Sequence, residues 1–173
     1  MSPVDEIIDV VLVDRDDNVL GYKEKFEAHH NPVPLHRAIS VVIYDKTRKY
    51  MLLQKRSTQK VTWPGFWSNT SCTHPLPDES YKDAAERRLF EEMGIKTPLT
   101  ESFNFIYKAK YDKTWGEHEL DHVFVGEYDG KVKLNPDEAE DYKWMKITDL
   151  KKDIKDNPGI YTPWFKIIVA RLH

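Results

Sequence analysis

Short apolar runs separated by polar turns dominate the first third of the chain. Residues 7–13 are almost entirely apolar, which predicts a strand, and the turn-prone residues 14–18 end it. Residues 38–44 and 50–53 form two further apolar runs, and the polar segment between them predicts a hairpin. The same kind of pattern later predicts strands at residues 103–111 and 120–128.

Apolar residues recur at helical spacing between residues 79 and 93. We expect a helix there that ends at Gly94 and packs one face on the sheet. Thr148 is placed to cap a short helix that ends before Pro158, and Thr162-Pro163 begins another with proline at its first position. The apolar face of the long helix consists of Tyr81, Ala84, Ala85, Leu89 and Met93.

Strands on both sides of a central helix predict one α/β domain over residues 1–173, with a mixed sheet covered by helices. The chain is 40% hydrophobic and 32% charged, as in a soluble globular protein. Its apolar runs are too short to span a bilayer, and acidic residues stand where a signal peptide would be positive. A net charge of −3 argues against nucleic-acid binding. We therefore expect a cytoplasmic protein that binds neither nucleic acid nor membrane.

The single cysteine lies in a run that is rich in aromatic and metal-ligating side chains. Lys55, Arg56 and Lys60 precede this run. A lone cysteine forms no intrachain disulfide, and burial as a small apolar side chain is its usual fate. Aromatic rings, cations and a histidine around one thiol favour a catalytic group instead. The run is Trp63-Pro64-Gly65-Phe66-Trp67-Ser68-Asn69-Thr70-Ser71-Cys72-Thr73-His74-Pro75.

The predicted long helix carries charges that indicate an anion site. Arg88 and Glu92 are one turn apart on one face, and alone they would form an ordinary surface ion pair. They belong, however, to a longer pattern that resembles the Nudix box, G-x5-E-x7-R-E-U-x-E-E-x-G-U, where U is apolar. The box implies a divalent cation that binds a diphosphate. The matching segment is Thr73-x5-Glu79-x7-Arg87-Arg88-Leu89-Phe90-Glu91-Glu92-Met93-Gly94-Ile95.

Two positions depart from the box. Thr73 stands in place of its glycine, and Arg88 stands in place of the first glutamate of its R-E pair. The loss of a metal-binding carboxylate argues against diphosphate hydrolysis, whereas an arginine is suited to grip a diphosphate through paired hydrogen bonds. The helix therefore predicts binding of a diphosphate rather than its cleavage.

Histidines and glutamates from distant segments form a second candidate site. Glu117 and Glu119 are two residues apart in a segment that we expect to be extended, so both point to one face. His29, His36 and His74 join them if the chain brings these segments together, and such a set suits Zn²⁺, Mn²⁺ or a similar ion. Each histidine alone is more often an ordinary core or surface residue, and the closely spaced pairs of a zinc finger are missing.

The cysteine run, the altered box and Trp115-Gly116-Glu117-His118-Glu119 together resemble type 1 isopentenyl-diphosphate isomerase, from about Asp9 to the C-terminus. The resemblance implies a Nudix-type α/β/α sandwich with a mixed sheet. It also implies isomerisation of isopentenyl diphosphate to dimethylallyl diphosphate in isoprenoid biosynthesis, without flavin or another redox cofactor. The implied partner is a small allylic or homoallylic diphosphate, and the implied assembly is a monomer or a homodimer.

The resemblance also assigns roles to the matching residues. The first ion is Mn²⁺, Zn²⁺ or Mg²⁺, and the neighbouring His30 leaves the choice of its first histidine open. The second ion is Mg²⁺, which binds the diphosphate and is held by Glu92 and the main-chain carbonyl of Cys72. The ligands of the first ion are His29, His36, His74, Glu117 and Glu119. The catalytic residues are Cys72, Glu119 and Tyr107, and the substrate-binding residues are Lys25, Arg56, Lys60, Arg88 and Trp164.

Isomerisation of an alkene needs two acid/base groups on its opposite faces, and Cys72 and Glu119 can fill these roles. We expect Glu119 on the proton-donor side and Cys72 on the acceptor side, although the sequence leaves this direction open. Two other classes of protein remain. One is a Nudix hydrolase of nucleoside diphosphate derivatives, against which Arg88 argues. The other is a non-catalytic module in which a bound metal fixes the fold.

Overall fold

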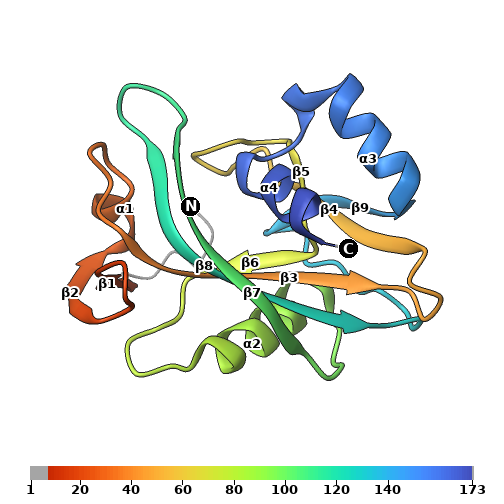
Figure 1. Cartoon of the computed structure of the whole chain (residues 1–173), viewed down its shortest axis with the longest axis horizontal. Coiled ribbons are helices and arrows are strands. Elements are labelled where there is room, and N and C mark those ends of the chain that lie inside the picture. Colours follow the sequence, from red (N-terminus) through yellow and green to blue (C-terminus); the bar gives the residue numbers. More distant parts are fainter. Residues whose placement is uncertain (1–7, 173) are drawn as a thin grey trace.

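A mixed β-sheet of nine strands forms the middle layer of the computed structural model, in which residues 8–172 are described (Figure 1). Helix α2 (Tyr81–Met93) covers one face, and α3 (Ile147–Asp156) and α4 (Pro163–Arg171) lie on the other. Helix α1 (Lys25–Ala28) and the 3₁₀ helix η1 (Pro158–Ile160) are short. The strands are β1 (Asp9–Val13), β2 (Val19–Glu24), β3 (His36–Tyr44), β4 (Tyr50–Arg56), β5 (Trp67–Ser68), β6 (Ser71–Thr73), β7 (Thr100–Lys110), β8 (Gly116–Glu127) and β9 (Ala139–Lys146).

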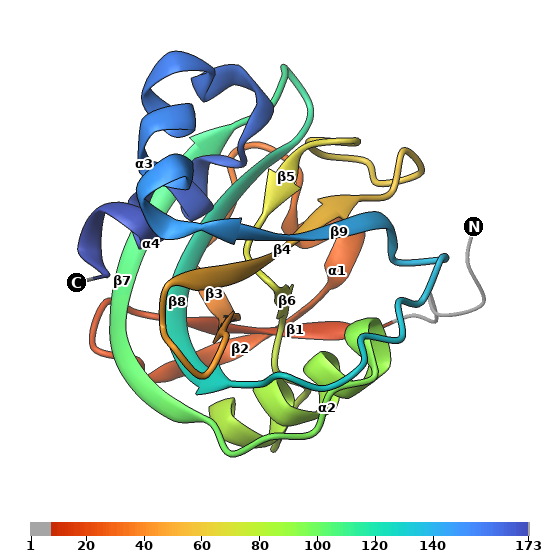
Figure 2. The same ribbon diagram turned by 90° about the vertical axis from the view of Figure 1, so that its right-hand side faces the viewer.

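Side chains of the central strand β3 point alternately to the two faces of the sheet. Ile39, Val41 and Ile43 pack in the apolar layer under α2. Val42 and Tyr44 pack in the layer that α3 and α4 cover. A strand buried on both faces needs a continuous apolar run, which is why this segment stands out in the sequence. The two apolar layers confirm the predicted α/β/α sandwich with a mixed sheet (Figure 2).

Strand β3 pairs with four other strands. Along one edge it runs parallel to β8 over residues 36–44. Its other edge is shared in succession by β1, β6 and β4. The predicted hairpin of β3 and β4 is therefore confirmed only at its closed end, where Ile43 and Tyr44 pair with Leu52 and Met51. Beyond that point the two strands separate, and β6 lies between them.

All five predicted strands are present, and the first begins at Asp9, while residue 7 lies outside the described residues. The apolar pattern did not reveal β2, β5, β6 and β9. Strand β9 is mostly polar and half-exposed, and it is strand because it pairs with β4 along the whole of β4. Strands β5 and β6 are two and three residues long, which is below the length that periodicity can detect.

The helix ends differ from the predictions where capping residues decide them. Helix α2 begins at Tyr81 rather than at residue 79, because Ser80 is the cap and its side chain accepts from the Asp83 amide at 3.1 Å. The prediction that Thr148 caps α3 is wrong, since the helix already begins at Ile147. Thr162 and Pro163 begin α4 as predicted. No helix among the described residues is long and apolar enough to cross a membrane.

Gly94 ends α2 in the left-handed conformation, with φ of 65°. A Cβ added there would lie 2.8 Å from Cβ of Lys133. We expect Gly94→Ala to lower the free energy of unfolding by about 2 kcal/mol, measured by urea denaturation. Gly159→Ala is the matched control, because a Cβ at Gly159 would meet open space within the described part of the chain. Equal losses in the two variants would contradict this account of the helix end.

Candidate active site

A cavity of about 340 Å³ lies beyond the point where β3 and β4 separate. Residues of β3, β4, β6, α2 and β8 form its walls, together with the loops at residues 57–62 and 137–138. All the residues predicted to bind metal or substrate or to catalyse line this cavity, apart from His36 and Tyr107. Those two contact Glu119, which is itself in the wall. The structure therefore brings the complete predicted set together.

Thr70 joins the separating strands. Its hydroxyl donates to the carbonyl of Leu52 on β4 at 2.7 Å and accepts from the amide of Ile43 on β3 at 2.9 Å. One side chain thus replaces the backbone bonds that the hairpin loses, and both buried groups stay satisfied. Through Thr70, the polar run before Cys72 connects β3 and β4 where these strands separate.

Asn69 and the short strand β6 place the thiol. The Asn69 amide donates to the carbonyl of Ser71 at 2.7 Å, and its oxygen accepts from the indole of Trp164 at 3.2 Å. Strand β6 pairs with β3 so that Cys72 lies opposite Ser40. Residues that are directly opposite project to the same face of a sheet, and both of these line the cavity.

Five side chains from four segments converge at one end of the cavity. Each of His29, His36, His74, Glu117 and Glu119 offers a ligand atom, and these atoms all lie within 4.8 Å of one another. Nε2 of His29 is 3.0 Å from Glu117, and Nε2 of His74 is 2.9 Å from Glu119. Buried imidazoles and carboxylates at this spacing are the donor set of a Zn²⁺ or Mn²⁺ site.

Two of the histidines are held with Nε2 toward the centre of this cluster. Nδ1 of His29 lies 2.6 Å from the carbonyl of Lys25, and Nδ1 of His36 lies 2.9 Å from the carbonyl of Pro34. A proton on each Nδ1 leaves Nε2 as a ligand, as in most histidine metal sites. Among the described residues, Nε2 of His36 is buried without a hydrogen-bond partner, and the buried Oε2 of Glu117 has an ion-pair contact with Nε2 of His29 but no hydrogen bond. Such atoms fit a metal ion that completes their contacts.

His30 lies outside the cluster. It is exposed, and its ring packs edge-on against Trp115 with centroids 4.4 Å apart. His29 is buried, and its ring is 4.8 Å from that of His36. Of the two adjacent histidines, only His29 faces the other ligands.

Glu119 is shared between the cluster and the cavity. Glu117, Glu119 and Asp121 alternate along β8 and line the cavity from one face, as expected for an extended segment. Oε2 of Glu119 faces His74, while its Oε1 accepts from the hydroxyl of Tyr107 on the neighbouring strand. Asp121 is buried next in line and accepts from Ser40 at 2.7 Å.

Burial changes the acidity of the two predicted acid/base groups. Burial and the nearby Glu92 raise the pKa of Cys72 to about 12, against the influence of Arg56. This shift favours a protonated thiol and works against the acceptor role expected for Cys72. Burial and Glu117 raise the pKa of Glu119 to about 7, so this carboxyl is available as an acid or as a base.

Buried ion pairs form another part of the cavity wall. Nε of Arg88 donates to Oε1 of Glu92 at 2.7 Å, and Gln54 donates to the other oxygen at 2.6 Å. Arg88 is only 9% exposed, so the pair is not the surface salt bridge that helical spacing alone would predict. Lys60 and Arg88 both contact Glu138. This part of the wall has the charge to hold an anion together with a divalent cation.

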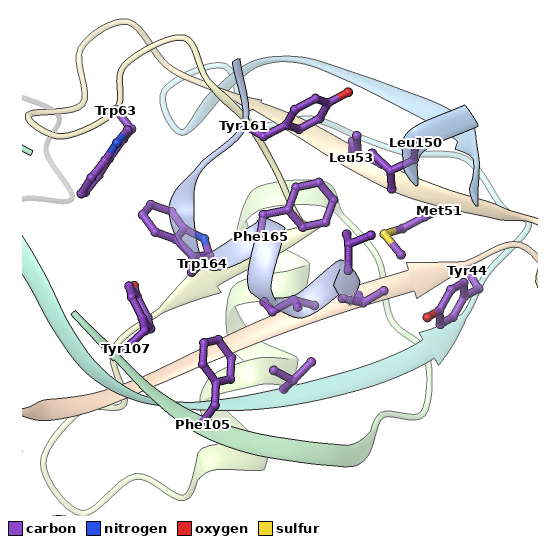
Figure 3. Close-up of a cluster of buried hydrophobic side chains, with 14 residues drawn as sticks. Tyr44, Met51, Leu53, Trp63, Phe105, Tyr107, Leu150, Tyr161, Trp164 and Phe165 are labelled. Atoms are coloured by element: carbon purple, nitrogen blue, oxygen red, sulfur yellow. The ribbon is translucent and has the colours of Figure 1, made fainter. Parts of the chain in front are cut away.

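Aromatic side chains form the apolar wall. The indole of Trp164 lies beside Trp63 and Tyr107, with ring centroids 5.5 and 6.1 Å away (Figure 3). The guanidinium of Arg56 lies over the Trp164 ring at 5.2 Å. Trp164 lines the cavity, whereas Trp63 packs in the apolar layer behind it. The wall is thus apolar next to Tyr107 and cationic next to Arg56.

Sequence reasoning missed several polar residues of the cavity wall, four of which contact other side chains of the site. Glu138 and Gln54 contact the predicted anion-binding pair, and Ser40 and Asp121 form a buried pair near Cys72. Glu138 lies in a polar segment that gave no periodic signal. Asp121 could have been found by extending the alternation of Glu117 and Glu119 one step along the same strand.

Comparison with known proteins defines the class. The chain matches the NUDIX domain family over residues 34–165. A crystal structure from Deinococcus radiodurans shares the fold with a TM-score of 0.78 at 15% identity, covering 94% of this chain and 98% of that one. A MutT protein from Methanosarcina mazei Go1 gives 0.65 at 22% identity, covering 80% and 92%. A sheet between helices, with a Nudix helix beside the cavity, makes this a Nudix protein.

Curated relatives then identify the family. An isopentenyl-diphosphate Delta-isomerase from Aromatoleum aromaticum is 45% identical over 94% of this chain and 85% of its own. Isomerases from Pectobacterium atrosepticum and Schizosaccharomyces pombe are 42% and 38% identical, over 96% and 91% of this chain and 92% and 78% of their own. The chain belongs to the type 1 isopentenyl-diphosphate Delta-isomerase family.

The adjacent histidines offer a test of the metal cluster. We expect the metal-free protein to bind one Mn²⁺ in a calorimetric titration, and His29→Gln to weaken binding by at least about tenfold because a ligand is lost. His30→Gln should bind as the wild type does, since its ring faces Trp115. Weakening by His30→Gln, or an unaffected His29→Gln, would show that the ion lies elsewhere.

Proposed function

We propose that this chain converts isopentenyl diphosphate to dimethylallyl diphosphate. The reaction protonates the alkene at one end and removes a proton two carbons away, through a tertiary carbocation. The observation that carries the proposal is one cavity with two acid/base side chains, an aromatic wall and buried cations. The family relationship to curated isomerases supports the same reaction.

The cations bind the diphosphate in this proposal. Arg56, Lys60, Arg88 and Lys25 line the cavity and are suited to contact its oxygens. Binding the diphosphate away from the reacting carbons orients the alkene, because the free energy of diphosphate binding offsets the cost of fixing the substrate in place. Glu92, with the main-chain carbonyl of Cys72, would hold the Mg²⁺ that accompanies the diphosphate.

Cys72 and Glu119 carry out the two proton transfers. One donates to the alkene and the other accepts from the cation, and the roles exchange in the reverse reaction. Tyr107 donates to Glu119 Oε1 and fixes the direction in which that carboxyl presents its other oxygen. The thiol of Cys72 reaches the cavity from β6, on a different strand from Glu119.

A metal ion supports Glu119 in this role. His29, His36, His74, Glu117 and Glu119 would hold Mn²⁺, Zn²⁺ or Mg²⁺, which when bound lowers the pKa of Glu119 and fixes its geometry. Burial lowers the pKa of His36 to about 4, which favours the neutral form that binds an ion. Against the effect of burial, Glu117 raises the pKa of His29 to about 9, so a bound ion would take the place of a proton there. We place the enzyme in the cytoplasm, as a monomer or a homodimer.

The aromatic wall protects the carbocation. The face of Trp164 can stabilise a positive charge, and the same ring excludes water that would otherwise capture the intermediate. The cavity volume of about 340 Å³ lies in the range of small-molecule sites. Hydrolysis is disfavoured because Arg88 occupies the position of a metal-binding carboxylate of the box.

Activity with a defined substrate tests the reaction. We expect the enzyme with Mg²⁺ and isopentenyl diphosphate to produce dimethylallyl diphosphate, detected as an acid-labile allylic product. Nucleoside diphosphate derivatives should release no phosphate under the same conditions. Phosphate release without isomerisation would instead establish a Nudix hydrolase.

Substitution of the acid/base pair tests the mechanism. We expect Cys72→Ala and Glu119→Gln each to reduce kcat by about a thousandfold or more, because a proton-transfer group is lost. Cys72→Ala keeps the main-chain carbonyl, so its loss of activity reports on the thiol. Glu127→Gln, at the exposed end of the same strand as Glu119, is the control and should retain full activity. Near wild-type turnover in either test variant would refute the assigned pair.

A further inference from the structure

Glu138 is a buried carboxylate on which two cations of the cavity converge. Its Oε2 is 2.7 Å from Nζ of Lys60 and 2.5 Å from Nη2 of Arg88. Glu138 is 4% exposed and lines the cavity. Arg88 contacts Glu92 through Nε, so its guanidinium lies between two carboxylates. Neither the Nudix box nor the cysteine run includes Glu138.

The main chain around Glu138 connects the two segments that supply these cations. The amide of Asn135 donates to the carbonyl of Glu92 in the last turn of α2 at 2.8 Å. The amide of Ser57 donates to the carbonyl of Glu138 at 3.4 Å, at the start of the loop that carries Lys60. Glu138 is therefore fixed to the Arg88 helix on one side and to the Lys60 loop on the other.

Glu138 is a counter-ion that Lys60 and Arg88 share, and it reduces the repulsion between them. Lys60 and Arg88 touch the same oxygen, so they lie close together, and two like charges at short range repel strongly where water is scarce. Lysine has three N–H donors and arginine has five, so one contact with Glu138 leaves each cation further donors for a second anion. Glu138 can thus hold both cations in place without consuming their capacity to bind a diphosphate.

We propose that Glu138 is a positioning residue that preorganises Lys60 and Arg88 for the substrate diphosphate. The inference rests on the proposed function, because it assigns these cations to that group. Preorganisation lowers the cost of ordering two long side chains when the ligand binds. Loss of Glu138 therefore weakens binding of the diphosphate while the acid/base pair stays intact.

Glu138→Gln tests this role, because it keeps the size of the side chain and removes its charge. We expect the KM for isopentenyl diphosphate to rise about tenfold, with kcat changed less than about threefold. The affinity for inorganic pyrophosphate with Mg²⁺, measured by calorimetry, should fall by a similar factor. The matched control is Glu140→Gln, which removes a carboxylate that pairs with Lys55 at the same 2.7 Å but outside the cavity. The control should leave both quantities unchanged.

A double-mutant cycle separates positioning from general stability. Lys60→Met alone should raise KM, and adding Glu138→Gln to it should raise KM by less than about threefold more, because only Arg88 is then left for Glu138 to position. Additive effects would overturn the proposal. So would an unchanged KM in Glu138→Gln, or a lower one, which would mean that Glu138 competes with the diphosphate.

Two readouts keep the inference distinct from the proposed reaction. Failure of the wild-type enzyme to isomerise would refute the reaction, while the pyrophosphate titrations would still test Glu138. Where thermal unfolding shows Glu138→Gln to be unfolded, Glu138→Asp replaces it. That variant keeps the charge but withdraws it by one methylene, and we expect a smaller rise in KM, by about threefold. No rise would overturn the proposal.

Discussion

The separation of β3 from β4 is the constraint on which the site depends. Two strands that part within a sheet leave backbone donors and acceptors unpaired, and burying them costs free energy unless other groups take their place. Thr70 supplies both replacements with one hydroxyl. The space gained admits β6, which carries Cys72, and leaves a cavity that residues of β3, β4, β6 and β8 line. The hydrogen bonds of Thr70 therefore both stabilise the separated strands and allow the thiol to be placed at the cavity.

Two charged side chains at the centre of the site, Glu119 and Arg88, each contact two other side chains. Glu119 faces a histidine with one oxygen and Tyr107 with the other. Arg88 lies between Glu92 and Glu138. Such arrangements keep buried charges paired, which is the condition for tolerating them at all. They also place the His/Glu cluster and the buried cations around a single small cavity.

The sequence allowed prediction of the layers and of the residues around the cavity, but only part of the strand pairing. Apolar runs revealed β3, and helical spacing revealed α2, because burial imposes those patterns directly. Strand β9 was missed because its pairing partner, not its own composition, makes it a strand. Glu138 was missed for a related reason, since its role depends on segments distant in the sequence. The resemblance already favoured His29 over His30, and the fold gives the physical reason, because only the His29 ring is buried.

The parallel pairing of β3 with β8 has a consequence for how the enzyme matures. His36 lies opposite Glu119 in that pairing, although some eighty residues separate them along the chain. Contacts between such distant segments carry a large loop-closure cost and form late in folding. During synthesis, α2 and the cysteine loop emerge before β8. The three histidines of the cluster are therefore synthesised before Glu117 and Glu119. Assembly of the metal cluster therefore depends on the pairing of β3 with β8.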